Sequence, residues 1–551
     1  MARTKQTFRT PTKPKKKEKS VPLPLVRQFE PVMRKYYPKT SRFFSHYSHH
    51  QPSDANNYHN GRDLQRYKRS FFRSFCANSG AQTAQLSQIP NNLRHLSIFE
   101  GSQIVLRKLI KQNKRLEHIV LAIEDEELNQ EVAKYLKYSK SLRSVTFKDR
   151  LPYFSDTMCQ KMLKTWGNTL EAFSILGAAH MKYSMKGEYF RRAMETILKF
   201  PKLKKLELKS SQIDFGKYFP FEKLQERNIA YEIGLETRQT TFKSLKKNSP
   251  QFEPTGLAVI KLFENDKMLG YQKFKEYSKQ VLFLYPQDRK RFEFHLLPVF
   301  QKILALDLAI YGTNLDLSSI GQLNSLKHLA IHFVSHGDTD DLFKYLNKNV
   351  APYQKLETFM ISCSGQEDQN QKSKKELSRK AIVKFFEACS ESLRTVHFGF
   401  HYPTEKSVDL EYFYEGLSKL KNLQSLTLIL GFQTFNSTKK VEEICEIVSK
   451  IKSLEELTFR IRKEKYQEKS FNLKFPLQLK KLCLGMKTPS VLFDASKTLW
   501  SLPNLTNLEL EFKSFKSQKW KNLIQSTLEK LKELKTFKIT DENGSRDVKK
   551  S

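Results

Sequence analysis

One spacing of apolar residues recurs along most of this chain and limits what it can fold into. The unit is an apolar residue, two variable positions, a second apolar residue, one variable position and a third apolar residue. Its second half alternates apolar and variable residues, which is typical of a β-strand. Fourteen such units, 23 to 37 residues apart within two blocks, begin at Leu93, Leu116, Leu142, Leu170, Leu203, Ile303, Leu326, Leu356, Leu393, Leu423, Leu454, Leu479, Leu505 and Leu534.

Amphipathic stretches separate these strands and are long enough for helices of two to four turns. The predicted helices span residues 126–139, 187–200, 379–390, 441–452 and 517–532. In residues 441–448, for example, Val441, Ile444, Cys445 and Val448 share one helical face. A strand followed by a helix cannot cover its own apolar face, so neighbouring units must stack. We therefore predict an α/β solenoid with an inner parallel sheet and helices outside.

The segments LKKLEL at 203–208, LQSLTL at 423–428 and LTNLEL at 505–510 resemble the strand signature of the leucine-rich-repeat superfamily. The long units look like its ribonuclease-inhibitor-like branch. The family's Asn or Cys ladder is mostly replaced, as Gly101, Ser211, Tyr311 and Val334 show, so the repeats are degenerate. The resemblance implies a non-enzymatic scaffold that binds a protein on its concave face, without a cofactor.

A gap of 100 residues separates Leu203 from Ile303. The segment LAVIKL at 257–262 fits the pattern, and weaker strands near Asn228 and Val281 would restore regular spacing. Residues 257–277 also read as a helix, so an inserted helical segment remains an alternative. We divide the chain into a disordered basic tail (1–85), repeats (86–215), degenerate repeats or a helical insertion (216–300), repeats (301–540) and a disordered C-terminus (541–551).

The chain is strongly basic, with 96 Lys and Arg against 58 Asp and Glu and a net charge of +38. A nucleic-acid groove would need a one-sided basic lining. The variable strand positions instead hold ten basic residues (Arg94, Arg143, Lys204, Lys205, Lys327, Arg394, Lys480, Lys481, Lys535 and Lys538) and eight acidic ones (Glu117, Glu171, Glu207, Asp307, Glu357, Glu455, Glu456 and Glu509). This balance favours a mixed-charge protein partner, although much of the surface Lys could merely aid solubility.

We select ten of these positions as candidate partner-binding residues on the concave face. They are Arg94, Arg143, Lys204, Lys205, Lys327, Arg394, Lys480, Lys481, Glu455 and Glu456.

Residues 1–85 hold eighteen basic and four acidic residues and too little apolar pattern to fold. We expect an irregular cap at residues 64–76, because open arrays need a shielded end. A Lys cluster resembles a nuclear localisation signal, with a mitochondrial presequence as the alternative. The cluster comprises Lys13, Lys15, Lys16, Lys17 and Lys19.

The segment ARTKQT at residues 2–7 is identical to the start of the tail of histone H three. If this resemblance is functional, Ala2, Arg3, Thr4 and Lys5 would engage a histone-tail reader. Phe8 departs from the histone pattern, and a generic basic arm is the alternative. A chromatin or nucleic-acid partner for the tail follows from either interpretation.

Sequence signals for catalysis are absent: there is no P-loop, G-x-G-x-x-G or H-E-x-x-H pattern. His328, His332 and His336 straddle a predicted strand and its loop, so we do not expect them to meet as a metal site. Six scattered Cys and no long apolar run favour a soluble protein of a reducing compartment, away from membranes. We predict a nuclear interaction scaffold. The alternatives are a substrate receptor of a ubiquitin ligase and a nucleic-acid-binding component of a ribonucleoprotein.

Overall fold

The structure is a computed structural model in which the chain forms two compact units, Met1–Phe72 and Arg73–Ser551. All described residues belong to the second unit. They are residues 74–78, 93–99, 110–122, 139–148, 156–176, 194–209, 221–236, 253–260, 268–285, 300–310, 320, 322–333, 351–363, 375–400, 410–430, 438–461, 473–486, 498–512, 518–541 and 544–548.

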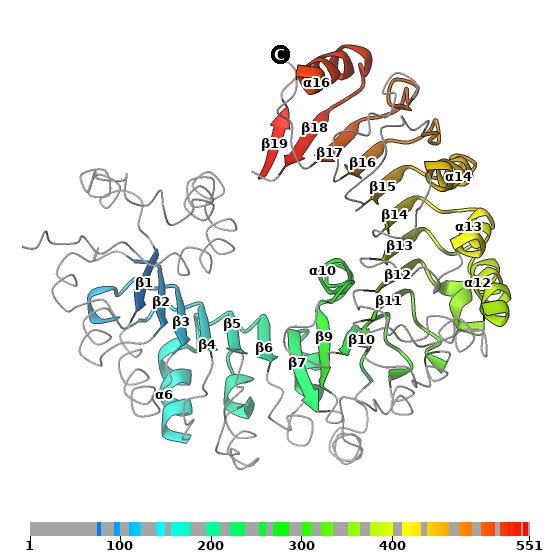
Figure 1. The fold of residues 1–551 in the computed structure, drawn as a ribbon. Coiled ribbons are helices and arrows are strands. Elements are labelled where there is room, and N and C mark those ends of the chain that lie inside the picture. Colours follow the sequence, from blue (N-terminus) through cyan, green and yellow to red (C-terminus); the bar gives the residue numbers. More distant parts are fainter. Residues whose placement is uncertain are drawn as a thin grey trace, which may run out of the picture. The chain divides into compact units, whose positions relative to one another are not determined.

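The fourteen strands expected from the apolar spacing all form (Figure 1). Each begins two residues after the first apolar residue of its unit, and each belongs to one 19-stranded sheet. They are β2 (His95–Phe99), β3 (His118–Ala122), β4 (Ser144–Lys148), β5 (Ala172–Leu176), β6 (Lys205–Lys209), β10 (Ala305–Ile310), β11 (His328–Phe333), β12 (Thr358–Cys363), β13 (Thr395–Phe400), β14 (Ser425–Leu430), β15 (Glu456–Ile461), β16 (Lys481–Met486), β17 (Asn507–Phe512) and β18 (Thr536–Asp541).

Five further strands complete the sheet. They are β1 (Ser74–Asn78), β7 (Ala230–Glu236), β8 (Leu257–Ile260), β9 (Gln280–Tyr285) and β19 (Gly544–Val548). β18 and β19 pair antiparallel, whereas the other pairings between described strands, such as β1 with β2, are parallel.

Helices pack against one face of the sheet, as expected from the strand–helix units. They are α6 (Asp156–Trp166), α8 (Phe221–Glu226), η6 (Ala351–Lys355), α12 (Lys375–Ala388), α13 (Leu410–Ser418), α14 (Thr438–Ser449) and α16 (Gln518–Lys530). Three of the predicted helices correspond to α12, α14 and α16, whereas α6 and α13 were not predicted. The helix predicted at residues 187–200 is described from residue 194, and residues 194–197 are helical. Residues 126–138 of the remaining predicted helix lie outside the described residues. None of the helices within the described ranges is long and apolar enough to cross a bilayer.

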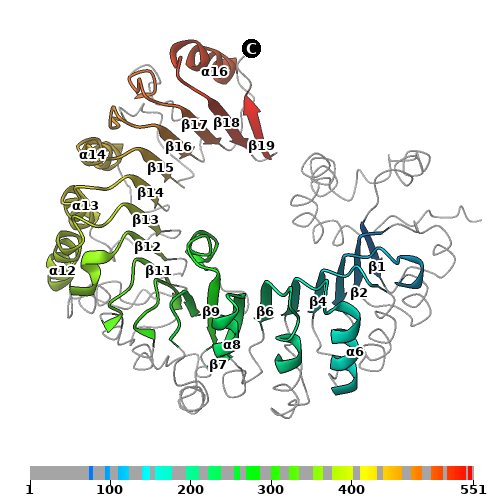
Figure 2. The same cartoon turned by 180° about the vertical axis from the view of Figure 1, so that it is seen from behind.

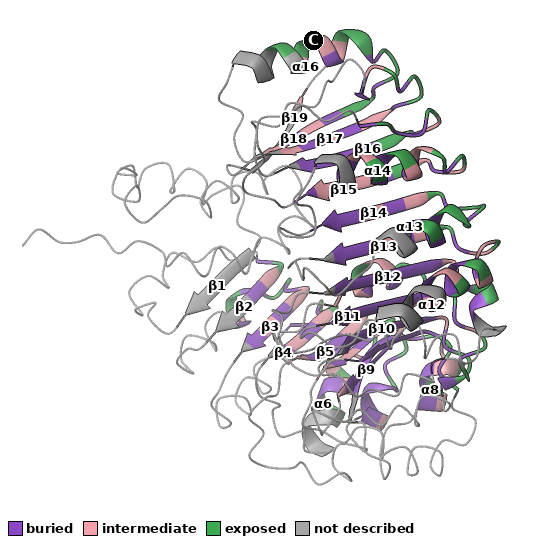
Figure 3. Ribbon diagram, turned by 45° about the vertical axis from the view of Figure 1, so that its right-hand side comes forward, coloured by how far each residue is buried: buried purple, intermediate pink, exposed green. Residues whose placement is uncertain are grey.

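The core lies between the sheet and these helices. In β6, Leu206 and Leu208 are fully buried while the residues on either side are partly exposed. The same alternation recurs in outer strands such as β15, whereas β8 and β11 are buried on both faces. The buried residues on the helix side form one apolar cluster through the stack (Figure 3). The chain is thus an α/β leucine-rich-repeat solenoid. We call the side of the sheet opposite these helices the helix-free face, because none of the helices named above lies on it. It corresponds to the predicted concave face, and one short helix, described next, crosses it.

The middle of the sheet departs from sequence order. β7 pairs with β9, β9 with β8, and β8 with β10, all in parallel, so β9 lies between β7 and β8. A parallel connection that steps backwards in the sheet stays right-handed only if it crosses the opposite face. The short helix α10 (Tyr271–Phe274), which lies between β8 and β9 in sequence, is indeed on the helix-free face (Figure 2).

Several expectations need correction. For residues 216–300 the alternative of a helical insertion is wrong: the strands expected near Asn228, at residues 257–262 and near Val281 form as β7, β8 and β9, and residues 257–277 are not one helix but β8 followed later by α10. Residues 544–548, expected to be disordered, form β19. Residues 74–78 form the regular strand β1 where we expected an irregular cap. His328 and His332 do not straddle a strand and its loop, because both lie within β11.

Candidate binding surface

The helix-free face is formed by the variable positions of the repeat. In β6 these positions are Lys205, Glu207 and Lys209, whose neighbours Leu206 and Leu208 point into the core. The residue just before each strand adds one more row, because its backbone pairs with the preceding repeat, as Glu117 N–H does with the Arg94 carbonyl (2.9 Å). All ten candidate partner-binding residues from the sequence lie on this face or on this row.

The charges of the first repeats form a ladder that alternates in sign. Along consecutive repeats the row before the strands reads Arg94, Glu117, Arg143, Glu171 and Lys204. The side chains pair across adjacent repeats: Arg94 with Glu117 at 3.3 Å, Arg143 with Glu171 at 3.7 Å, and Lys204 with Glu171 at 3.0 Å. The Lys204 hydrogen bond lowers the pKa of Glu171 below its usual value. Each cation is therefore matched by an acid of this chain.

The later repeats follow the same rule. Lys327 pairs with Glu357 at 2.7 Å, Lys480 with Glu455 at 2.8 Å, and Lys481 with Glu456 at 3.6 Å. The candidate Lys205 pairs with Glu207 beside it. Of our ten candidates only Arg394, which is exposed, has no acidic partner among the residues that the structure describes. The near-neutral balance counted from the sequence is thus a set of local ion pairs.

The centre of the helix-free face is apolar and covered. Leu257, Val259, Val281, Phe283, Ala305, Ala330 and Met360 form a second buried cluster with Phe274 of α10. We call residues 268–279, which contain α10 and the turn after it, the cover segment. Gly270 fits tightly in it, because a Cβ there would lie 2.8 Å from Cβ of Ala330 and 2.5 Å from the Phe274 ring.

A buried aspartate on β10 holds the start of the cover segment. The Gly270 N–H donates to Oδ2 of Asp307 at 2.8 Å. Burial raises the pKa of Asp307 to about 7, although the N–H groups of Gly270, Tyr271 and Leu269 act in the opposite direction. The sequence count treated Asp307 as a surface acid, but it is fully buried beneath the cover segment.

A buried glutamate on β7 holds the middle of the segment. Glu232 is 2% exposed and accepts a hydrogen bond from the Tyr271 hydroxyl at 2.7 Å. Lys275 of the segment and Lys209 of β6 form ion pairs with the same carboxylate. Burial alone would raise the pKa of Glu232, but these cations and hydrogen bonds outweigh it and lower the pKa. The carboxylate is therefore charged and links the segment to two strands.

Two buried histidines face the same surface from β11. His328 Nδ1 lies 3.1 Å from Oγ1 of Thr358, and Tyr277 of the cover segment stacks flat on the His328 ring at 4.2 Å. Burial lowers the pKa of His328 to about 4. His332 Nδ1 contacts the Ser362 hydroxyl, yet both residues are at most 3% exposed, so this pair reaches no substrate and serves packing.

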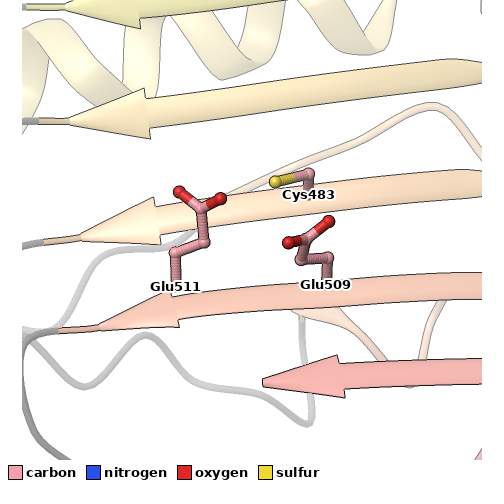
Figure 4. Close-up of side chains that lie close together, drawn as sticks. All are labelled: Cys483, Glu509 and Glu511. Carbon is pink, nitrogen blue, oxygen red and sulfur yellow. The ribbon is translucent and has the colours of Figure 1, made fainter. Parts of the chain in front are cut away.

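Three potential metal ligands lie together near the C-terminal end of the sheet (Figure 4). Ligand atoms of Cys483, Glu509 and Glu511 lie within 4.8 Å of one another. However, the Arg460 guanidinium binds Glu511, and Lys538 binds Glu509 at 3.1 Å. Burial raises the pKa of Cys483 to about 11, so its thiol is protonated. The chain's own cations neutralise this cluster, and we assign no metal to it.

The sequence did not reveal the cover segment as a site. Its signal was present in the strands beneath: residues 257–260 and 281–284 are continuous apolar runs, as in strands buried on both faces. The tail candidates, namely the Lys cluster at residues 13–19 and the histone-like residues 2–5, lie outside the described residues.

Comparisons with known proteins give no family. No family model matches the chain, and no curated protein matches it. Solved structures that it resembles include a leucine-rich-repeat protein of Leptospira interrogans (TM-score 0.32, 16% identity, 82% of this chain and 98% of that chain). Others are a chain of the Drosophila Toll–Spätzle complex (0.29, 12%, 77% and 54%) and a chain of the yeast Rad7–Elc1 complex (0.24, 11%, 93% and 87%). At these TM-scores the fold assignment rests on the strand order and register above.

Proposed function

We propose that the chain is a non-enzymatic scaffold that binds a protein partner on its helix-free face. The observation that carries this proposal is the pairing of charges between adjacent repeats, which leaves a polar surface of nearly balanced charge. Such a surface suits hydrogen bonding to a protein, whereas phosphate backbones are bound by unpaired Lys and Arg that displace counterions. The nucleic-acid alternative for this face is therefore disfavoured.

The test compares partners of the full chain with those of a version that begins at Arg73, which keeps β1. Proteins retained by both belong to the repeats. Thr458→Arg, in the middle of β15 on the helix-free face, should then release them. Gln525→Arg introduces the same side chain on the exposed side of α16 and should not. Release by the α16 variant alone would contradict the proposal, and a cullin-linked complex among the retained proteins would favour the ubiquitin-ligase alternative.

For the tail we propose a separate role in nuclear import and in contact with acidic or chromatin partners. This proposal rests on the Lys cluster and on the net positive charge of residues 1–85. Replacement of Lys15, Lys16 and Lys17 by Ala should move the protein from the nucleus to the cytoplasm. An unchanged distribution would remove the nuclear assignment.

The histone-like start of the chain supports a narrower proposal, capture by a histone-tail reader. Readers of this kind recognise a free amine and a Lys, so Lys5→Ala and a blocked N-terminus should each abolish capture. Capture that survives both changes would leave only a generic basic arm.

A further inference from the structure

The cover segment presents an unusual side chain at the centre of the helix-free face. Tyr277 is 50% exposed, and it and Leu477 are the large apolar side chains that the described part of the chain leaves exposed. Leu477 lies in the turn before β16, outside the strands that form the helix-free face. Tyr277 therefore marks a place where the central surface is not closed by the chain itself.

Tyr277 is held in one orientation. Its ring stacks on His328, with an angle of 6° between the planes, and His328 is fixed in turn by Thr358. Directly upstream, Phe274 is fully buried and Gly270 is bonded to Asp307. An aromatic side chain that is already ordered loses little conformational entropy when a partner packs on it. This is the usual property of an interface hot spot.

Charged groups of both signs lie around this ring. The pKa of His328 is lowered chiefly by burial, and the charges of Glu357, Lys327 and Lys273 also act on it, so these groups lie around the stack. Glu357 is already bound by Lys327. Arg394 follows Glu357 on the next strand, where its N–H bonds the Glu357 carbonyl at 2.9 Å, and its own side chain is exposed. Lys273 is half-buried, and the charges of Glu456 and Glu276 act on it, so Arg394 is the exposed cation here that has no acidic partner among the described residues.

Beyond the stack, β13 offers a hydroxyl group that no described residue of the chain uses. Thr358, Thr395 and Ser425 occupy matching positions on β12, β13 and β14. Thr358 is buried and bonded to His328, and Ser425 donates to Glu456, so Thr395 is the partly exposed hydroxyl that is left. Adjacent strands lie about 4.8 Å apart, so Tyr277, Arg394 and Thr395 fall within the length of a short peptide. The surface combines an ordered ring, an exposed cation and a hydroxyl group.

We infer that the surface around Tyr277 binds an acidic peptide segment of the partner that carries an aromatic side chain. The inference rests on the proposed function and specifies its site and its ligand chemistry. The aromatic side chain packs against the exposed part of Tyr277, a carboxylate pairs with Arg394, and the Thr395 hydroxyl hydrogen-bonds the peptide backbone. A basic segment would be repelled by Arg394.

The test selects binders of the full-length chain from a library of random displayed peptides. Selected peptides should be enriched in Asp and Glu next to an aromatic residue. Their affinity, measured by fluorescence anisotropy, should fall at least about tenfold with Tyr277→Ala and with Arg394→Glu. Two matched controls should bind as well as the parent chain: Leu477→Ala removes the other exposed apolar side chain, and Lys535→Glu makes the same charge reversal at the far end of the same row.

The outcomes separate the inference from the proposed function. Enrichment of basic peptides, no enrichment, or affinity unchanged by Tyr277→Ala and Arg394→Glu would overturn the inference. If such peptides nevertheless lose affinity with Thr458→Arg, binding to the helix-free face stands and only its centre was misplaced. If Thr458→Arg is also without effect, the proposed function fails with it.

Discussion

The outer repeats and the central stretch from β7 to β10 use the same apolar spacing but end in different structures. In the outer repeats, strands follow one another in sequence order and their variable positions form a polar face with paired charges. In the centre, β9 is inserted between β7 and β8, and the variable positions are mostly apolar and buried. The spacing thus determines that a strand forms, whereas the residues at the variable positions determine whether its second face stays open.

The exchange of strand order explains why the centre needs a cover. The connection from β8 to β9 crosses the helix-free face and brings its own apolar side chain, Phe274, onto the apolar strands. It also buries two carboxylates, Glu232 and Asp307, which the outer repeats would leave in water. Buried charges are tolerated only when they are paired or protonated, and the two residues show one solution each.

Removal of the Phe274 ring should have the largest effect on the stability of the centre relative to the outer repeats. Phe274→Ala should cost about 3–5 kcal/mol locally, because it leaves a cavity between the cover segment and the sheet. Hydrogen exchange should then rise in residues 268–285 and remain low in β13–β15. Phe385→Ala removes an equally buried ring of α12, where stacked repeats depend on each other, and should raise exchange in the neighbouring repeats. If both variants raised hydrogen exchange over an equally wide range of neighbouring strands, the centre would not unfold as a separate unit.

A single added methyl group should have a smaller effect on stability, which should again be larger in the centre than in the outer repeats. Gly270→Ala places a Cβ 2.5 Å from the Phe274 ring and should lower the free energy of unfolding of the cover segment by about 2 kcal/mol. Gly399→Ala, on β13 in the outer repeats, meets its nearest atom, Nε2 of His397, at 3.2 Å and should cost less than about 1 kcal/mol. Urea unfolding followed by exchange measures both, and similar losses would contradict the tight fit at the centre.

Sequence reasoning succeeded where one repeat determines its own structure. Each of the fourteen units placed its strand correctly, because burial of alternate Leu side chains depends on residues within a few positions. The sequence did not predict that β9 lies between β7 and β8. The spacing of apolar residues around Val281 is the same whichever strands β9 pairs with. Likewise, counting Asp307 as a surface charge assumed an open face. What covers that face is decided by a connection whose own sequence shows little regular pattern.

The buried carboxylates of the centre should make its stability depend on pH in a way that the outer repeats do not share. The folded-state pKa of Asp307 is raised to about 7, above the value of about 3.9 in an unfolded chain. The native state therefore holds a proton that the unfolded state has released, and stability should fall as the pH rises from about 4 to about 7. Asp307→Asn should remove this decline, which we expect to be about 2–3 kcal/mol between pH 5 and pH 8. Urea unfolding at the two pH values measures it.

Glu232 provides the control of opposite sign. Its pKa is lowered in the folded state, so its contribution is present above its ordinary pKa and is lost as the pH falls through the acid range. Glu232→Gln should flatten only the acid end of the stability profile and leave the decline caused by Asp307 in place. A profile in which both substitutions act over the same pH range would refute the assignment of the two carboxylates.

The charge ladder should give the smallest effect. Lys480 and Glu455 are about half exposed, and exposed pairs of this kind contribute about 0.2–1 kcal/mol, reduced further by salt. A double-mutant cycle with Lys480→Ala and Glu455→Ala should return a coupling energy of that size. Lys209→Ala should cost more than Lys480→Ala, because it removes a partner from the buried carboxylate of Glu232. If Lys480→Ala caused the larger loss of stability, the ion pairs of the outer repeats would be needed to stabilise the fold. A partner could then not replace these pairs with its own contacts, and the outer repeats would be a poor binding surface.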